Sequence, residues 1–236
     1  MKKIVVSFAD ESGNYRKQMK RLEESLEKVG FDGIFKGYTS FEEIGSPPHK
    51  GPGSVPYAFK AYAIKKGMQE LDSGLFLWLD SPIYATNSLN GIFEHIDDEG
   101  YIFFDNIGHN LGTWTSDACL ERFNISRERS FGIHMTMACA YGFSTDSFLA
   151  MEMMQDYIGA AADGVSYRGD WYNNQFQVSR SDKVHGHRHD QAVQSALLWK
   201  YRMNLTIGQS TFFAYKEHIG RMPVSDSVCL WSEAMR

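Results

Sequence analysis

The sequence predicts a single α/β domain, residues 1–236, with a mostly parallel central sheet flanked by helices. Residues 3–9 (KIVVSFA) and 75–79 (LFLWL) are nearly continuous apolar runs, which are typical of strands buried on both faces. Predicted strands alternate with predicted helices along the chain, as βαβ units require. The length of 236 residues and the hydrophobic content of 43% fit one ordered domain with a sizeable core.

The first third of the chain predicts a strand, a helix and a second strand. After the strand at 3–9, a helix is expected over residues 15–29, followed by a strand over 31–35. Gly30 offers the left-handed conformation that ends many helices. The apolar positions of the helix fall on one face at a period of 3.6, which places them in the core: Tyr15, Met19, Leu22, Leu26 and Val29.

The remaining elements are predicted around a proline-rich loop. Residues 45–56 (GSPPHKGPGSVP) hold four of the six prolines, so we expect a surface loop. A helix is expected over 57–71 despite Gly67, and the strand at 75–79 ends in Asp80. Further strands are expected at 101–104, 133–140 and 205–207, with helices at 116–123, 146–159 (capped by Thr145 or Ser144) and 190–201. The part from about residue 205 is less regular.

Composition excludes several classes of protein. The net charge of -5 disfavours a nucleic-acid partner, because binding many phosphates needs clustered basic residues. The three cysteines, Cys119, Cys139 and Cys229, are too few and too far apart for a disulfide framework, which predicts reduced thiols and a cytoplasmic protein. The apolar start ends at Asp10, too early for a signal peptide, and no apolar stretch reaches the roughly 18–20 residues of a transmembrane segment.

Asp80 is the first candidate functional residue. It follows the most apolar strand, and an acid in that position lies at the carboxyl edge of a parallel sheet, where open α/β sheets bind ligands. A carboxylate there could hold a divalent cation that neutralises a diphosphate. The alternative is a turn-forming Asp before Ser81 and Pro82.

The second candidate is the polar turn His-Arg-His-Asp-Gln at residues 187–191, which precedes the last predicted helix. Asp190 at the helix start is equally explained as an N-terminal cap. The histidines at 185, 187 and 189 alternate as zinc ligands can, but no acidic or cysteine partner stands at a familiar spacing.

The order of these features resembles nucleotide-sugar-dependent glycosyltransferases of the GT-A type. The resemblance covers roughly residues 1–220 and rests on FKAYAIKKGMQEL, LWLDS and HRHDQAVQSALL, of which two short stretches are specific. It implies a GT-A-like (Rossmann-like) domain and a hexosyltransferase-like enzyme of polysaccharide biosynthesis. In such families a D-x-D signature after a strand holds a metal and the donor diphosphate, and a later Asp or Asp-Gln faces the acceptor. Asp80 and Asp190 are therefore the expected catalytic residues.

One departure affects the expected metal. The D-x-D position has the sequence Asp80-Ser81-Pro82, so the second carboxylate is absent. The resemblance implies that Mn²⁺ or Mg²⁺ could bind through Asp80 and His218, for which an ordinary surface histidine is the alternative. Without a cation, Lys60, Lys65 or Arg188 must stabilise the departing diphosphate.

The remaining site residues follow from the same resemblance. The donor is expected near the end of the first strand, at Ala9, Asp10 and Tyr15, with Lys60, Asp80, Ser81 and Arg188 completing its site. Aromatic and amide side chains suit a sugar ring, so the acceptor is expected at Trp171, Tyr172, His189, Asp190 and Gln191.

Three functions remain open from the sequence. The first is transfer of a sugar from a nucleotide-sugar donor to a glycan-like acceptor. The second is a catalytically silent sugar-nucleotide or glycan-binding protein, which the missing second acid favours. The third is a nucleotidyltransferase, although its usual glycine-rich phosphate loop is not present in ADESGNYRK after the first strand.

Overall fold

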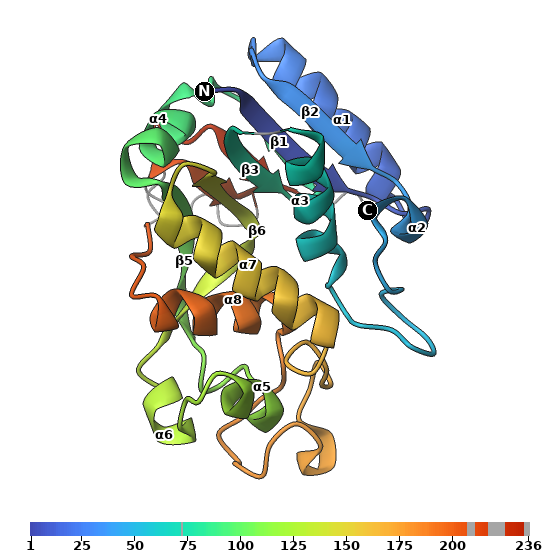
Figure 1. Ribbon diagram of the computed structural model, residues 1–236, viewed down its shortest axis with the longest axis vertical. Helices are drawn as coiled ribbons and strands as arrows, with labels where there is room; N and C mark the ends of the chain where they lie inside the picture. Colours follow the sequence, from blue (N-terminus) through green and yellow to red (C-terminus); the bar gives the residue numbers. More distant parts are fainter. Residues whose placement is uncertain (72, 207–210, 217–224, 234–236) are drawn as a thin grey trace.

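The computed structural model describes residues 1–71, 73–206, 211–216 and 225–233. A five-stranded sheet with the order β2-β1-β3-β6-β5 forms its centre (Figure 1). β1 pairs in parallel with β2 and β3, whereas β6 is antiparallel to both of its neighbours, β3 and β5. Four of the five strands therefore point the same way, and the predicted mostly parallel sheet is confirmed.

The elements of the described chain alternate as follows: β1 (Lys3–Phe8), α1 (Tyr15–Lys28), β2 (Ile34–Tyr38), α2 (Phe41–Ile44), α3 (Phe59–Glu70), β3 (Leu75–Leu79), β4 (Ile83–Ala85), α4 (Asn90–Glu99), β5 (Tyr101–Asn110), α5 (Asp117–Arg122), α6 (Arg127–Ser130), β6 (His134–Ser144), α7 (Phe148–Asp163), the 3₁₀ helix η1 (Asn174–Phe176), α8 (His189–Lys200), β7 (Phe213–Tyr215) and β8 (Leu230–Ser232).

Alternate side chains of the central strands build two cores. Phe76 and Trp78 of β3 pack with residues of α3, α7 and α8 on one face. Leu75, Leu77 and Leu79 pack with α1 and α4 on the other. Because successive side chains of a strand point to opposite faces, a strand that is apolar throughout needs helices on both sides. The sequence of β3 thus explains the three layers.

Most predicted elements are present, with shifted ends. α1 ends as expected at Gly30, which has a φ of 71°, while the amide of Phe31 donates to the carbonyl of Leu26. That closing turn uses Phe31, so β2 starts at Ile34 and the strand predicted over 31–35 is placed too early. The cap of α7 is Ser147, not Thr145 or Ser144, because Ser144 still belongs to β6.

Two other expectations need correction. Tyr15 is 48% exposed rather than packed in the core, because it is the first residue of α1 and lies beyond the end of the sheet. The strand predicted at 205–207 is reduced, in the described part, to one bridge between Thr206 and Phe104.

The last described elements form a separate small sheet. β8 pairs antiparallel with β4 and parallel with β7, and Phe213 and Leu230 bury their side chains in the core under α1 and α4. Across the described ranges, no helix has both the length and the apolar character needed to cross a bilayer.

Candidate active site

A cavity of about 330 Å³ lies at the carboxyl ends of β1 and β3, under the loop of residues 45–58. β1 and β3 are parallel neighbours, so the residues that follow them emerge at the same edge of the sheet. The cavity is lined by Phe8, Ala9, Asp10, Ser12, Tyr15, Phe41, His49, Lys50, Tyr57, Phe59, Lys60, Asp80, Ser81 and Pro82.

Six of the seven predicted donor-site residues line this cavity together: Ala9, Asp10, Tyr15, Lys60, Asp80 and Ser81. Asp10 accepts hydrogen bonds from the backbone and the hydroxyl of Ser12, which fixes the turn between β1 and α1. The opposite wall is aromatic, with Phe8 and Phe59 stacked at 4.7 Å between ring centroids. The cavity thus combines flat apolar rings with carboxylates and a lysine.

The charged floor of the cavity is formed by Lys60 and Asp80, which line it, together with Asp190, which pairs with Lys60 and does not line the cavity. The ammonium of Lys60 lies 2.9 Å from Asp80 Oδ1 and 2.8 Å from Asp190 Oδ2, and it donates to the carbonyl of Ala138 at 2.9 Å. The side chains of Lys60 and Asp190 are 4% and 7% exposed, whereas that of Asp80 is 30% exposed. Asp80 is therefore the carboxylate of this cluster that a ligand can reach.

Proton affinities in the charged floor follow from burial and from the neighbouring charges. Burial raises the pKa of Asp80, and the Asp190 carboxylate adds to that rise against the opposing effect of Lys60. Burial alone would lower the pKa of Lys60, but the charges of Asp190 and Asp80 outweigh it and raise the pKa. Lys60 is thus a cation at neutral pH. The pKa of Asp80 is moved toward the range in which a carboxylate accepts protons most effectively.

Asp80 is held from several sides. The indole N–H of Trp78 donates to its Oδ1 at 2.7 Å, and its backbone N–H donates to the carbonyl of Cys139 in β6 at 2.8 Å. Its own carbonyl accepts from the amide of Ile83, closing a turn over Ser81 and Pro82. The turn predicted as the alternative is therefore present and coexists with a buried ion pair.

Asp190 lies inside the first turn of α8 and does not cap it. Arg188 occupies the cap position, and no side chain caps the helix there. The Gln191 amide donates to the carbonyl of Thr136 at 2.7 Å, and the Ser195 hydroxyl accepts from the amide of Thr136 at 3.0 Å. These bonds fasten α8 to β6, so Gln191 has a structural contact and Asp190 is directed at Lys60.

Arg188 lies outside the cavity. Its guanidinium is sandwiched between the rings of Trp114 and Trp171, at 3.8 and 3.9 Å from their centroids, and it donates to the carbonyl of Trp171. Trp171 and Tyr172 are 42% and 59% exposed, so they belong to the surface next to the cavity. Trp171 reaches the cavity wall through Tyr57, at 6.2 Å between ring centroids.

The three histidines do not form a zinc site. His187 accepts from the amide of Ser116 through Nδ1, and its Nε2 lies 2.9 Å from the carbonyl of Ser166. His189 uses Nδ1 on the carbonyl of Tyr167 and stacks on Tyr57 at 5.3 Å. Burial, with the nearby His189, lowers the pKa of His187 to about 3, which keeps this ring neutral.

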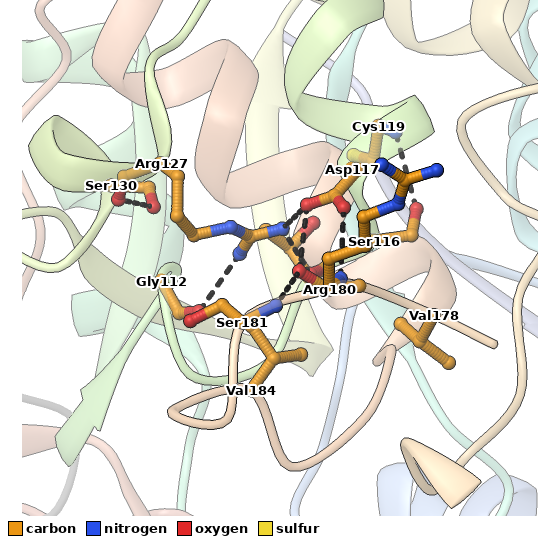
Figure 2. A network of polar contacts seen from close by, with 12 residues as sticks. Gly112, Ser116, Asp117, Cys119, Arg127, Ser130, Val178, Arg180, Ser181 and Val184 are labelled. Carbon is orange, nitrogen blue, oxygen red and sulfur yellow. Dashed lines mark hydrogen bonds and ion pairs between the residues drawn. The ribbon is translucent and has the colours of Figure 1, made fainter. Parts of the chain in front are cut away.

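The loop of residues 164–188, which carries Trp171 and Tyr172, is anchored by a polar network (Figure 2). Arg127 donates to the carbonyl oxygens of Gly112 and Thr115 and pairs with Asp117. Asp117 accepts from the hydroxyl of Ser179 and from the amide of Arg180. In Figure 1 this loop lies with α5 and α6 at the end of the molecule away from β1 and β2.

Comparisons with known proteins concern the fold. No family model and no curated protein matches this chain. Among 159 matching chains of solved structures is the crystal structure of a glycosyltransferase involved in the glycosylation of the major capsid of PBCV-1. It matches with a TM-score of 0.54 at 12% identity, over 100% of this chain and 95% of that one. The shared property is the fold.

The described residues do not build a resident metal site. In the described ranges, no three His, Cys, Asp or Glu side chains come together as a metal site would need. Both oxygens of Asp80 contact Lys60, and one also accepts from Trp78. His218 lies outside the described residues. Among the described residues Asp80 has no partner ligand, so it can hold a cation there only together with ligands that arrive with a substrate.

Several cavity residues were missed by the sequence analysis because they lie on the 45–58 loop or just after it. His49 and Tyr57 are joined by a bond from the Tyr57 amide to His49 Nδ1 at 2.9 Å, and their rings meet at 4.5 Å. Tyr57 has a φ of 60°, which is rare for a bulky residue and frequent at functional sites. The basic and aromatic residues within a Pro/Gly-rich loop were the available signal.

Proposed function

We propose that this protein is a glycosyltransferase that binds a nucleotide-sugar donor in the cavity at the carboxyl ends of β1 and β3. The observation that carries the proposal is the position of Asp80. It is a partly exposed carboxylate, held by Lys60 and Trp78, on the floor of a cavity with aromatic walls. The match in fold to a glycosyltransferase supports it.

The roles follow from the geometry. Phe8, Phe41 and Phe59 offer flat surfaces for a base or a sugar ring, with Phe8 and Phe41 at 5.1 Å between centroids. Ala9, Asp10, Tyr15 and Ser81 lie around the same space. The acceptor enters from the side of Trp171 and Tyr172, whose exposed rings suit the apolar face of a sugar.

In the reaction, the oxygen of an acceptor hydroxyl forms a bond to the anomeric carbon of the donor. The bond between that carbon and the diphosphate oxygen breaks, and the nucleoside diphosphate leaves. Asp80 accepts the hydroxyl proton, a role that its raised pKa favours. Asp190 is buried behind Lys60, so we assign it the role of holding Lys60, and through it Asp80, in place.

The decisive experiment is turnover of a nucleotide-sugar panel by the wild type and by Asp80→Asn, measured as release of nucleoside diphosphate. We expect turnover of one donor by the wild type and a fall of about 10²–10⁴ in the variant, the usual size of general-base catalysis. Asparagine keeps the shape and can still accept from Trp78. Unchanged turnover in a folded Asp80→Asn protein would remove Asp80 from the mechanism.

A silent binding protein is the second candidate, because both oxygens of Asp80 are already engaged by Lys60. It predicts binding of a nucleotide sugar with neither transfer nor hydrolysis. The same panel separates the two, since a binding protein shows saturable donor binding and no release of nucleoside diphosphate.

A further inference from the structure

The bound donor would bring a diphosphate into a cavity that already contains the carboxylates of Asp10 and Asp80. Oxyanions bind where cationic donors are free to face them. Lys60 is not free, because an ammonium has three N–H donors and this one meets Asp80, Asp190 and the carbonyl of Ala138. Donating to a phosphate would require Lys60 to give up a partner inside the protein.

The other expected counter-charges are placed elsewhere. Arg188 is stacked between Trp114 and Trp171 and does not line the cavity. Lys65 is exposed on α3 and does not line it either. None of the three cations expected from the sequence is therefore free, in this structure, to pair with the diphosphate.

Among the described residues that line the cavity, Lys50 is the cation that remains. It lines the cavity, it is exposed, and it forms no ion pair or side-chain hydrogen bond with the described residues. The turn that carries it is ordered, since the Ser54 amide donates to the carbonyl of Gly51 and the Val55 amide to that of Pro48. Gly51, at a φ of 93°, takes a conformation that a side chain would strain.

The turn is also tied down on both sides of Lys50. Val55 is buried in the core, and His49 accepts the Tyr57 amide while packing against Phe59 at 5.8 Å. Lys50 is thus held at the cavity by its neighbours, while its own ammonium has no protein partner in the described chain. A cation placed in this way can face an oxyanion bound in the cavity without giving up a protein partner.

We propose that Lys50 is the diphosphate-binding cation of the donor site, and that it gives this protein affinity for nucleoside diphosphates without a resident metal. The proposal rests on the proposed function. It specifies the ligand as the diphosphate group itself, so Lys50 contributes to binding of a nucleoside diphosphate and nothing to binding of the nucleoside alone.

Calorimetric titration in EDTA tests this. Wild type, Lys50→Gln, Lys50→Arg and Lys65→Gln are titrated with uridine, guanosine, adenosine, cytidine and thymidine diphosphates, and with the nucleoside matching the tightest of them. We expect Lys50→Gln to weaken the diphosphate about tenfold or more, and Lys50→Arg to retain most of the affinity. Lys65→Gln, the matched exposed lysine, should bind as the wild type does. The nucleoside should bind all four proteins equally.

The outcomes separate the two proposals. Equal diphosphate affinity in wild type and Lys50→Gln overturns the role of Lys50 and leaves the proposed function standing. An equal loss for nucleoside and diphosphate also overturns it, because the substitution then acts on the shape of the loop. If the wild type binds none of the diphosphates in EDTA, this inference fails, and the proposed function fails with it only if none binds after Mn²⁺ or Mg²⁺ is supplied as well.

Discussion

The charged floor of the cavity and the anchored 164–188 loop are both polar, yet they are stabilised in opposite ways. In the charged floor, Lys60 is sealed from solvent between Asp80 and Asp190, so opposite charges compensate each other in a buried setting. Around the loop, Asn173 of the loop itself and Arg127 of α6 direct their side chains mainly at backbone groups. The first arrangement depends on every member, whereas the second spreads its energy over many bonds.

The difference matches what the proposed function would require of each region. A group that takes part in bond making needs a fixed position, and strands β1 and β3 with helices α3 and α8 provide it. Under the same proposal, the loop presents a surface to the acceptor, here the exposed rings of Trp171 and Tyr172. Because the side chain of Asn173 is neutral, its hydrogen bonds to the backbone fix the shape of that loop without adding a charge to it.

The largest expected effect comes from Lys60→Met. Removing the shared cation leaves two carboxylates near one another without compensation, and breaking a buried ion pair costs about 3–5 kcal/mol of folding free energy. Urea unfolding of the wild type and the variant measures it. The double variant Lys60→Met with Asp190→Asn should recover part of the loss, because it removes one uncompensated charge. A loss under about 1 kcal/mol in the single variant would show that the charged floor is not a tightly coupled unit.

A smaller effect is expected from Asn173→Ala in the loop. Its side-chain amide donates to the carbonyl oxygens of Ser179 and Val184, and its oxygen accepts from the amides of Val178 and Ser179. We expect a loss of about 1–3 kcal/mol, because buried backbone groups lose their partners. Hydrogen exchange should quicken within residues 173–184 and stay unchanged in β1 and β3. The comparable variant Asn174→Ala serves as the control, because the exposed side chain of Asn174 makes no hydrogen bond to the described residues.

The last expected effect is confined to acidic pH. His187 has a pKa lowered to about 3, so its ring stays neutral in the folded protein while the unfolded chain takes up a proton below about 6.5. Its contribution to stability is therefore complete above about 6.5 and is lost as the pH falls toward 3, at about 1.4 kcal/mol per pH unit. Urea unfolding between pH 7 and 5 should show a shallower decline in His187→Asn. If the free energy of unfolding falls equally with pH in the wild type and in His187→Asn, the pH dependence arises at a group other than His187.

The sequence predicted the parts of this fold that local pattern determines. The apolar run of β3 and the period of α1 identified both elements, and Asp80 was located because the end of a buried strand is visible in a sequence. Asp190 was chosen as a candidate only from the residues next to it in the sequence, the polar turn at residues 187–191. Its contact with Lys60 joins residues 130 positions apart, which no local pattern encodes.

Other features were missed for the same reason. Arg188 looked like a free cation because its sandwich between Trp114 and Trp171 depends on how two distant loops meet. Lys50 was not singled out, because residues 45–56 were predicted only as a surface loop and the bonds that fold this loop involve backbone groups. Residues near a strand end could be predicted, and residues on long loops could not.

The most direct test of the proposed donor site is a crystal structure of the protein with the nucleoside diphosphate that binds tightest in the titrations. We expect the ligand in the cavity at the ends of β1 and β3, with a ring against the wall of Phe8 and Phe59 and its diphosphate within hydrogen-bond reach of Lys50. A ligand bound elsewhere, for example in the groove beside α1 and β4 that is lined by Arg21, Lys28 and Tyr84, would contradict the proposed site.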